Sequence, residues 1–174
     1  RDPKFLAAAS ALAALDLADK QPEAAKARFE GVLKVDPKNA SAMLGLAELL
    51  QRTGGTHEQV AKRIGEAIAA DPANPTARLA LIDHHARARD YKAALAAAQA
   101  AVAALPDHAE IVEKQARVQL ASGDTQQALT SLNRLTQLRP DAATAFIALA
   151  EGQLAANDLD AASRSARRAL ELAP

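Results

Sequence analysis

Proline recurs along this chain at nearly constant intervals. Six of its eight prolines are separated by 34, 35, 34, 34 and 34 residues: Pro3, Pro37, Pro72, Pro106, Pro140 and Pro174. Proline lacks an N–H and clashes with the preceding turn, so it ends a helix and disfavours helix in the residue before it. A fixed period of this length indicates a repeat architecture in which each copy is one supersecondary unit. We therefore expect five consecutive repeats.

A second set of turn residues lies midway between these prolines. It consists of Asp19-Lys20-Gln21-Pro22, Gly54-Gly55-Thr56, Arg89-Asp90, Gly123-Asp124 and Asn157-Asp158. Each repeat is then a helix, a short turn and a second helix, with helices of about 13 to 15 residues. Asn74 before Pro75 predicts an N-cap followed by proline at the first helical position. The expected repeats, one array over residues 1–174, are 4–37, 38–72, 73–106, 107–140 and 141–174.

The composition favours helices independently of the period. The chain contains 47 alanines, three phenylalanines, one tyrosine and no tryptophan. Alanine has the highest helix propensity, whereas strands favour β-branched and aromatic residues. We therefore expect an all-α protein with closely packed helices.

The charge balance limits the kinds of partner. Twenty-one basic residues match twenty-one acidic ones, and the pI is about 7.1. Nucleic-acid binding usually needs a basic face, so no nucleic-acid partner is expected. No apolar run approaches the roughly 18 residues of a membrane span, so no direct membrane insertion is expected. The first residue is Arg1 rather than Met, and we expect the chain to be a piece of a longer protein.

Small residues recur at three places of the repeat when the prolines are set at the thirty-second place. The eighth place holds Ala13, Ala47, Ile82, Ala116 and Ala150. The twentieth holds Ala25, Val60, Ala94, Ala128 and Ala162, and the twenty-seventh holds Val32, Ala67, Ala101, Leu135 and Ala169. This pattern resembles the tetratricopeptide repeat (TPR), although the large aromatics usual at the fourth and eleventh TPR places are mostly absent. The resemblance implies a right-handed α-solenoid of about five helix-turn-helix units.

Other helical repeats fit less well. HEAT and armadillo repeats are longer, and ankyrin repeats carry a Thr-Pro-Leu-His signature that is missing here. RNA-reading helical repeats have a similar period, but they need a basic groove.

The TPR resemblance implies a concave groove lined by the second, fifth, ninth, twelfth and thirteenth places. A protein or peptide segment is the expected partner there. The candidate partner-binding residues are Leu44, Glu48, Arg52, Leu79, Asp83, Arg87, Glu113, Arg117, Ile147, Glu151 and Leu154. The first repeat contributes only the chemically plain residues Ser10, Ala14 and Leu17. The Lys/Asn/Arg clamp that TPR cochaperones use to hold a chaperone's C-terminal carboxylate is missing.

The charged candidates have a simpler interpretation as well. Glu48–Arg52, Asp83–Arg87 and Glu113–Arg117 each place an acid four residues before a base, which is typical of exposed helical pairs worth about 0.2–0.5 kcal/mol. Either the two charges of each pair only neutralise each other on the helix surface, or they belong to a groove of mixed polarity that binds a partner.

Catalytic and metal-binding motifs are not expected. His84 and His85 are adjacent on a helix and point about 100° apart, so we expect packing rather than metal ligation. His57-Glu58 lacks the second histidine of a zinc-protease motif, and His108 lies in a turn between repeats. Arg164, Arg167 and Arg168 are expected to complement the C-terminal helix dipole rather than to bind an anionic partner. The chain is therefore predicted to be non-enzymatic, with no catalytic residue, metal or other cofactor.

Two segments resemble one bacterial TPR family more specifically. RTGGTHEQVAKRIGEAIAADP (52–72) and LPDHAEIVEKQARVQLASGDTQQALTSLNRLTQLRP (105–140) resemble the TPR-repeat lipoproteins of the PEP-CTERM/exosortase system (PrsT-type). That resemblance implies a scaffold in an exopolysaccharide and protein-sorting system. It also implies lipid anchoring in the periplasm or outer membrane of a Gram-negative cell envelope. The alternative is a regulatory or substrate-recruiting TPR segment of a larger cytoplasmic protein, an enzyme included.

The ends of the array carry a further expectation. Pro3 ends a repeat that precedes this sequence, and no polar capping helix follows the last repeat. We expect the apolar face of the last helix, including Leu170 and Leu172, to pack on a neighbouring TPR unit or another molecule.

Overall fold

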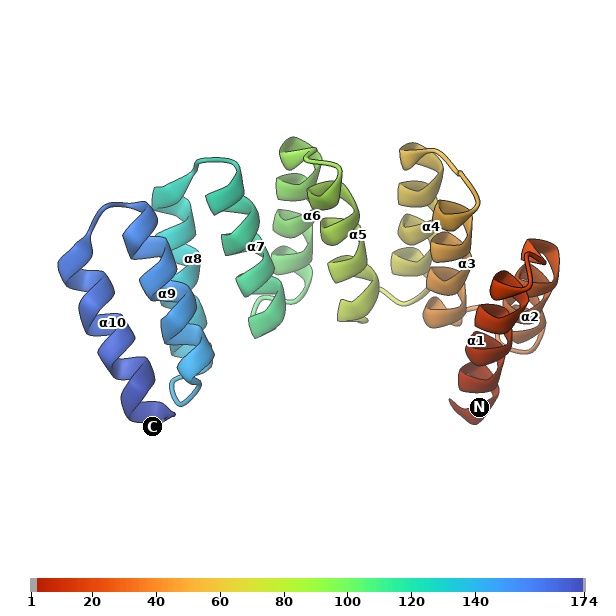
Figure 1. Cartoon of the computed structure of the whole chain (residues 1–174), viewed down its shortest axis with the longest axis horizontal. Helices are drawn as coiled ribbons and strands as arrows, with labels where there is room; N and C mark the ends of the chain where they lie inside the picture. Colours follow the sequence, from red (N-terminus) through yellow and green to blue (C-terminus); the bar gives the residue numbers. More distant parts are fainter. Residues whose placement is uncertain (1–2, 174) are drawn as a thin grey trace. The chain divides into compact units, whose positions relative to one another are not determined.

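The computed structural model describes residues 3–173, and these form ten α-helices with no strand among them (Figure 1). The helices are α1 (Pro3–Ala18), α2 (Pro22–Val35), α3 (Ala40–Arg52), α4 (His57–Ala70), α5 (Pro75–Arg87), α6 (Tyr91–Ala104), α7 (Ala109–Ala121), α8 (Thr125–Leu138), α9 (Ala143–Ala155) and α10 (Leu159–Leu172). The all-α prediction and the five helix-turn-helix repeats are confirmed. None of the described helices has the length and apolarity that crossing a bilayer requires.

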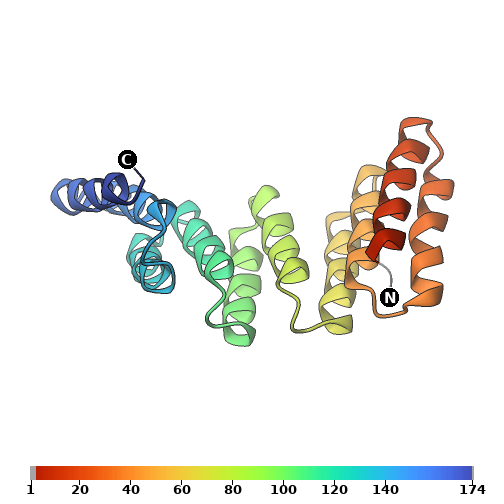
Figure 2. The same ribbon diagram turned by 90° about the horizontal axis from the view of Figure 1, so that it is seen from below.

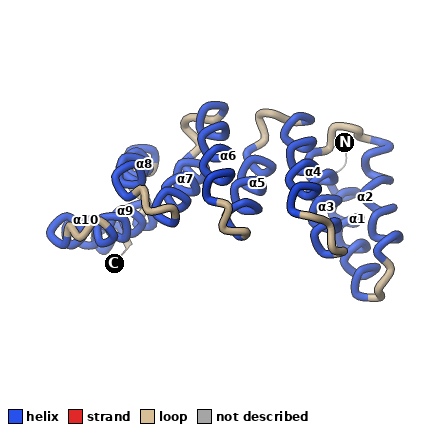
Figure 3. Tube along the Cα trace, turned by 90° about the horizontal axis from the view of Figure 1, so that it is seen from above, coloured by secondary structure: helices blue, strands red, loops and turns tan. Residues whose placement is uncertain are grey.

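The chain divides into two compact parts between Leu81 and Ile82, within α5. In the N-terminal part, α1 packs on α2, α2 on α3, and α3 on α4. In the C-terminal part, each helix from α6 to α10 packs on the next. Figures 2 and 3 show from below and above that α1 lies beside α2 and α9 beside α10.

The turn inside each hairpin contains one residue in the left-handed conformation. These residues are Lys20, Gly54, Arg89, Gly123 and Asn157, with φ of 58°, 90°, 58°, 88° and 61°. At each of them, paired 5→2 and 6→1 backbone hydrogen bonds close the preceding helix in a Schellman motif. Glycine adopts this conformation without steric cost, whereas lysine and arginine adopt it under strain. The turns predicted from the mid-repeat residues are therefore observed in all five repeats.

The residue after that turn usually caps the second helix. The carboxylates of Asp90, Asp124 and Asp158 each accept a hydrogen bond from the backbone N–H three residues on. Thr56 forms a full capping box with Gln59. These bonds satisfy N–H groups that the first turn of a helix leaves without intrahelical partners.

The recurring prolines fix the other end of each hairpin. The second helices of the repeats end two residues before the proline, at Val35, Ala70, Ala104, Leu138 and Leu172. Between these ends and the next helix, Asn39 and Asn74 cap α3 and α5 through their side-chain oxygens, at 2.9 Å from a backbone N–H in each case. The predicted cap at Asn74-Pro75 is confirmed.

The small-residue places form the interior of the array. Every residue at the eighth, twentieth and twenty-seventh places is buried, the larger exceptions Ile82, Val60, Val32 and Leu135 included. Because most of these side chains are alanine, the helices can approach at the short end of the usual 8–10 Å range. Phe29, Leu132 and Leu149 fill the space between them and are also buried.

The eleventh place, where TPR sequences usually carry an aromatic, is instead tied to the twenty-third place by polar contacts in three repeats. In the fourth and fifth repeats, Ser131 and Ser165 donate hydrogen bonds to the side-chain oxygens of Gln119 and Gln153, at 2.8 and 2.7 Å. In the first repeat, Arg28 Nε lies 2.9 Å from Asp16 Oδ2. The hydrogen bond and charge of Asp16 raise the pKa of the Arg28 guanidinium. These contacts fix the register of the two helices in the hairpin.

Candidate functional site

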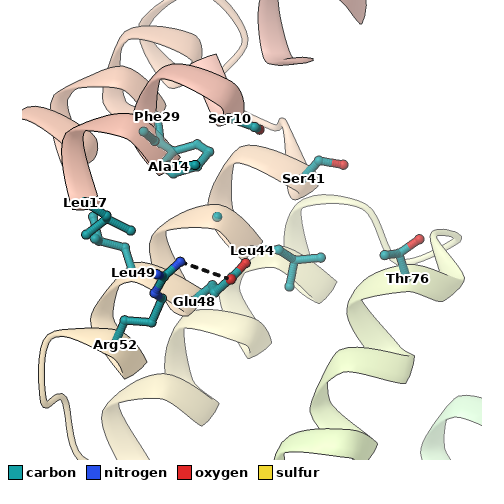
Figure 4. A pocket seen from close by; sticks show the side chains of 12 residues that line it. Ser10, Ala14, Leu17, Phe29, Ser41, Leu44, Glu48, Leu49, Arg52 and Thr76 are labelled. Atoms are coloured by element: carbon teal, nitrogen blue, oxygen red, sulfur yellow. Dashed lines mark ion pairs between the residues drawn. The ribbon is translucent and has the colours of Figure 1, made fainter. Parts of the chain in front are cut away.

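A pocket of about 310 Å³ opens in the N-terminal part, between α1 and α3 (Figure 4). It is lined by Ser10, Ala13, Ala14, Leu17, Phe29, Ser41, Leu44, Gly45, Glu48, Leu49, Arg52 and Thr76. These residues come from the first three repeats. The pocket lining includes most of the residues at the groove-facing places of these repeats, as the TPR resemblance assigns them. Leu44, Glu48 and Arg52 are among them.

The pocket combines an apolar lining with polar groups of two kinds. The large apolar side chains of the lining are Leu17, Leu44, Leu49 and the ring of Phe29. Hydroxyl groups come from Ser10, Ser41 and Thr76, and Figure 4 shows them as separate sticks around the opening. Such a mixture, apolar walls with a few placed polar groups, is typical of sites that bind a small ligand or a peptide side chain.

One ion pair lies at the edge of the pocket. Arg52 Nη1 lies 4.0 Å from Glu48 Oε1, and both side chains are more than half exposed, at 57% and 72%. An exposed pair of this length contributes little to stability. Its charges are therefore available to a ligand at small energetic cost.

Small residues create the hollow. Ala13 and Ala14 of α1 and Gly45 of α3 all line the pocket, and a Cβ on Gly45 would lie 2.6 Å from Cζ of Phe29 and 2.8 Å from its Cδ1. Glycine at this place lets the Phe29 ring reach under α3. The first repeat contributes to this pocket, because its short side chains at Ser10 and Ala14 are part of the lining. A run of small residues at groove places could have signalled a cavity.

Leu79 on α5 is half-buried and does not line the pocket, whereas Thr76, one turn earlier, does. The predicted apolar strip also includes Ile147 and Leu154 on α9, which are 48% and 55% exposed. The candidates thus fall into two sets, one in each compact part, and Leu44 and Leu79 are less accessible than Ile147 and Leu154.

The charged candidates of the C-terminal part are paired differently from the prediction. Glu113 and Arg117 form the expected pair on α7, at 2.8 Å, and Arg87 and Glu151 are exposed. Asp83, however, pairs with Lys114 of α7 at 2.6 Å, and among the described residues Arg87 is not its ion-pair partner. The first helices of successive repeats lie close enough for this pair, whose side chains are only 29% and 32% exposed, to form across them.

His84 lies in the packing, and His108 lies at a helix cap. His84 is buried, and its ring meets that of His85 edge-on with centroids 5.6 Å apart. His108 occupies the N-cap of α7 without a side-chain capping bond. Arg168 lies 5.9 Å from the centre of the Phe146 ring and 3.0 Å from Glu171, so part of the arginine cluster on α10 has partners within the fold.

Family models match nearly the whole chain. One model described as tetratricopeptide repeat matches residues 16–55, and a second with the same description matches residues 55–109 and 113–174. No curated protein matches the chain in sequence.

Solved structures share the fold at low sequence identity. MamA is 19% identical, with a TM-score of 0.69 over 92% of this chain and 93% of its own. YrrB, described as a TPR protein with an unusual peptide-binding site, is 19% identical, with a TM-score of 0.66 over 95% of this chain and 85% of its own. PilF of Pseudomonas aeruginosa is 17% identical, with a TM-score of 0.69 over 98% and 78%. Together with the buried small-residue places, the family matches show that this chain belongs to the tetratricopeptide repeat family.

Proposed function

We propose that this chain is a protein-interaction scaffold that binds a segment of another protein in the pocket between α1 and α3. The observation that carries the proposal is the coincidence of a 310 Å³ pocket with the groove-facing places of three successive repeats. Tetratricopeptide repeats are generally non-enzymatic protein-binding scaffolds. The peptide-binding site named for YrrB gives further support.

The lining suggests the chemistry of the bound segment. An apolar side chain of the partner would occupy the space between Leu17, Leu44 and Phe29. The hydroxyls of Ser10 and Ser41 would hydrogen-bond to its backbone, because an extended segment brings unpaired N–H and C=O groups.

A second contact strip is proposed on α9 for the same kind of partner. Ile147 and Leu154 expose apolar surface on either side of the charged Glu151. Exposed leucine and isoleucine beside a charge are suited to a segment of mixed polarity. The C-terminal part would thus offer a contact of its own to such a partner.

A pocket-filling substitution tests the first contact. Peptides are selected from a random displayed library on the wild-type chain, and their affinities are measured by fluorescence polarisation. Ala14→Trp places a large ring at an exposed position in the pocket, and Ala27→Trp makes the same change on the exposed side of α2 outside it. We expect at least about tenfold weaker binding for Ala14→Trp, since an excluded apolar anchor loses about 1.5–3 kcal/mol. Equal affinity for both variants would refute the pocket as the site.

For the cellular context we propose the PEP-CTERM/exosortase system of a Gram-negative envelope. The support is the resemblance of residues 52–72 and 105–140 to its TPR lipoproteins. The test combines fractionation of the native bacterium with cross-linking mass spectrometry on the full-length protein. Recovery with the outer membrane and cross-links to sorting or export components support this context. Recovery in the cytoplasm as part of a larger protein supports the regulatory alternative instead.

A further inference from the structure

The lining of the pocket between α1 and α3 changes in character from its opening to its base. Three lining residues are buried, and we call them the floor: Ala13, Phe29 and Leu49, which are 2%, 8% and 6% exposed. Six lining residues are exposed, and we call them the rim: Ser10, Ala14, Ser41, Glu48, Arg52 and Thr76. Every lining side chain that carries oxygen or nitrogen belongs to the rim (Figure 4). The pocket therefore has a polar opening and an apolar base.

The floor offers a ligand no hydrogen-bond partner among the described lining residues. The side chains of Ala13, Phe29 and Leu49 are apolar. These residues lie inside α1, α2 and α3, where the backbone N–H and C=O groups bond along the helix. A polar atom of a ligand that reached the floor would lose its water and gain no partner in exchange. The end of a side chain that fills this pocket must therefore be apolar.

The size of the pocket favours an aromatic ring over a branched aliphatic chain. Its volume of 310 Å³ is well above the roughly 150 Å³ of an apolar protein cavity that holds benzene. An anchor that is too small leaves part of the lining without contacts, and those dispersion contacts are lost. A ring on the ligand can also pair edge-to-face or offset with the ring of Phe29. The Phe29 ring is held close under α3, since a Cβ on Gly45 would lie 2.6 Å from its Cζ.

We propose that the pocket binds a phenylalanine side chain of the partner segment, an inference that rests on the proposed peptide binding and specifies its anchor. The phenyl ring fills the space above the floor, and the backbone of the segment stays at the rim beside Ser10 and Ser41. Tyrosine has the same ring but carries its hydroxyl at the far end, where the floor cannot pair it. Tryptophan brings an N–H that also needs a partner when it is buried. Leucine is apolar but smaller.

Three matched peptides test this specificity. A peptide selected on the wild-type chain is scanned with alanine to find its anchor, and Phe, Tyr or Leu is then placed at that position. Tyr differs from Phe by one oxygen, which isolates the polarity of the floor, and Leu isolates the effect of size. We expect the Phe peptide to bind at least about fivefold more tightly than either of the others, measured by fluorescence polarisation.

Methyl NMR spectroscopy tests where the anchor lies. Leu49 is on the floor, whereas Leu33 packs against the same core cluster without lining the pocket. The ring current of the bound Phe peptide should shift the methyl resonances of Leu49 and leave those of Leu33 nearly unchanged. The Leu peptide has no ring at the anchor and should shift the Leu49 resonances less. Unshifted Leu49 resonances at saturating Phe peptide overturn the proposal.

The outcomes separate this inference from the proposed function. If Ala14→Trp and Ala27→Trp bind the selected peptides equally well, the pocket is not the site and both proposals fail. A selection that yields no binding peptide has the same consequence. If Ala14→Trp alone loses binding while the Tyr or Leu peptide binds as tightly as the Phe peptide, the pocket remains the site and only the phenylalanine anchor is overturned.

Discussion

Replacing Gly45 with alanine should reveal how closely α2 and α3 approach. Gly45 lies inside α3, and a Cβ built there would sit 2.6 Å from Cζ and 2.8 Å from Cδ1 of Phe29. Carbon atoms pack favourably at about 3.5–4.0 Å, so the ring or the helix must move. The Phe29 ring is buried and has little room to do so.

The expected free energy follows from two opposing effects. Alanine is favoured over glycine inside a helix by about 0.8–1.0 kcal/mol. Overpacking of a filled core costs about 1–3 kcal/mol. Gly45→Ala should therefore destabilise the chain by up to about 2 kcal/mol.

Gly65→Ala is the matched control. Gly65 lies inside α4, and a Cβ there would have no neighbour within 4 Å. Only the helix preference then acts, so this variant should be more stable than the wild type by about 0.5–1 kcal/mol. The same substitution should thus lower the free energy of unfolding at Gly45 and raise it at Gly65, on neighbouring helices.

Urea unfolding followed by far-UV circular dichroism measures the free energy of unfolding, and hydrogen exchange in α2 and α3 localises any loss. Adding Phe29→Leu removes the two ring atoms nearest the new methyl group, and the double variant should recover at least about 1 kcal/mol relative to additivity. If Gly45→Ala stabilises the chain as much as Gly65→Ala does, the close approach of Phe29 to α3 is wrong.

Three further variants probe the contact strip on α9, a helix cap and a hairpin contact. The double change of Ile147 and Leu154 to Asp should weaken binding of selected peptides while leaving the helical signal intact; unchanged binding would count against the strip on α9. Asp124→Ala removes the N-cap bond of α8 and should lower the free energy of unfolding by about 1 kcal/mol, measured in urea, with Asp124→Asn near wild type. Ser131→Ala removes the 2.8 Å hydrogen bond to the buried Gln119 and should cost about 1–3 kcal/mol, and no loss would show that this bond does not hold α7 to α8.

Much of the fold was predictable because its signals are local. The proline at Pro72 and the cap at Asn74 act on residues within one turn of themselves, and α4 and α5 end and begin there as expected. Alanine at a fixed place of the repeat indicated burial, and Ala94 and Ala128 are fully buried. Neither inference required knowledge of residues distant in sequence.

The pairing of side chains between helices was less predictable. Asp83 was expected to pair with Arg87 one turn along α5, yet its partner is Lys114, which is 31 residues away in sequence. Spacing along one helix says which residues can meet on that helix. It does not say which residue of another helix comes closer.

The 34-residue spacing of the prolines, with alanine at recurrent places, was enough to establish an array of five helical hairpins, because helix ends and small-residue contacts depend on local chemistry. The packed structure was needed to show the pocket beside Ala14 and Gly45. A pocket is the volume that side chains from several helices leave unfilled. It is therefore a property of the assembled helices rather than of any one repeat.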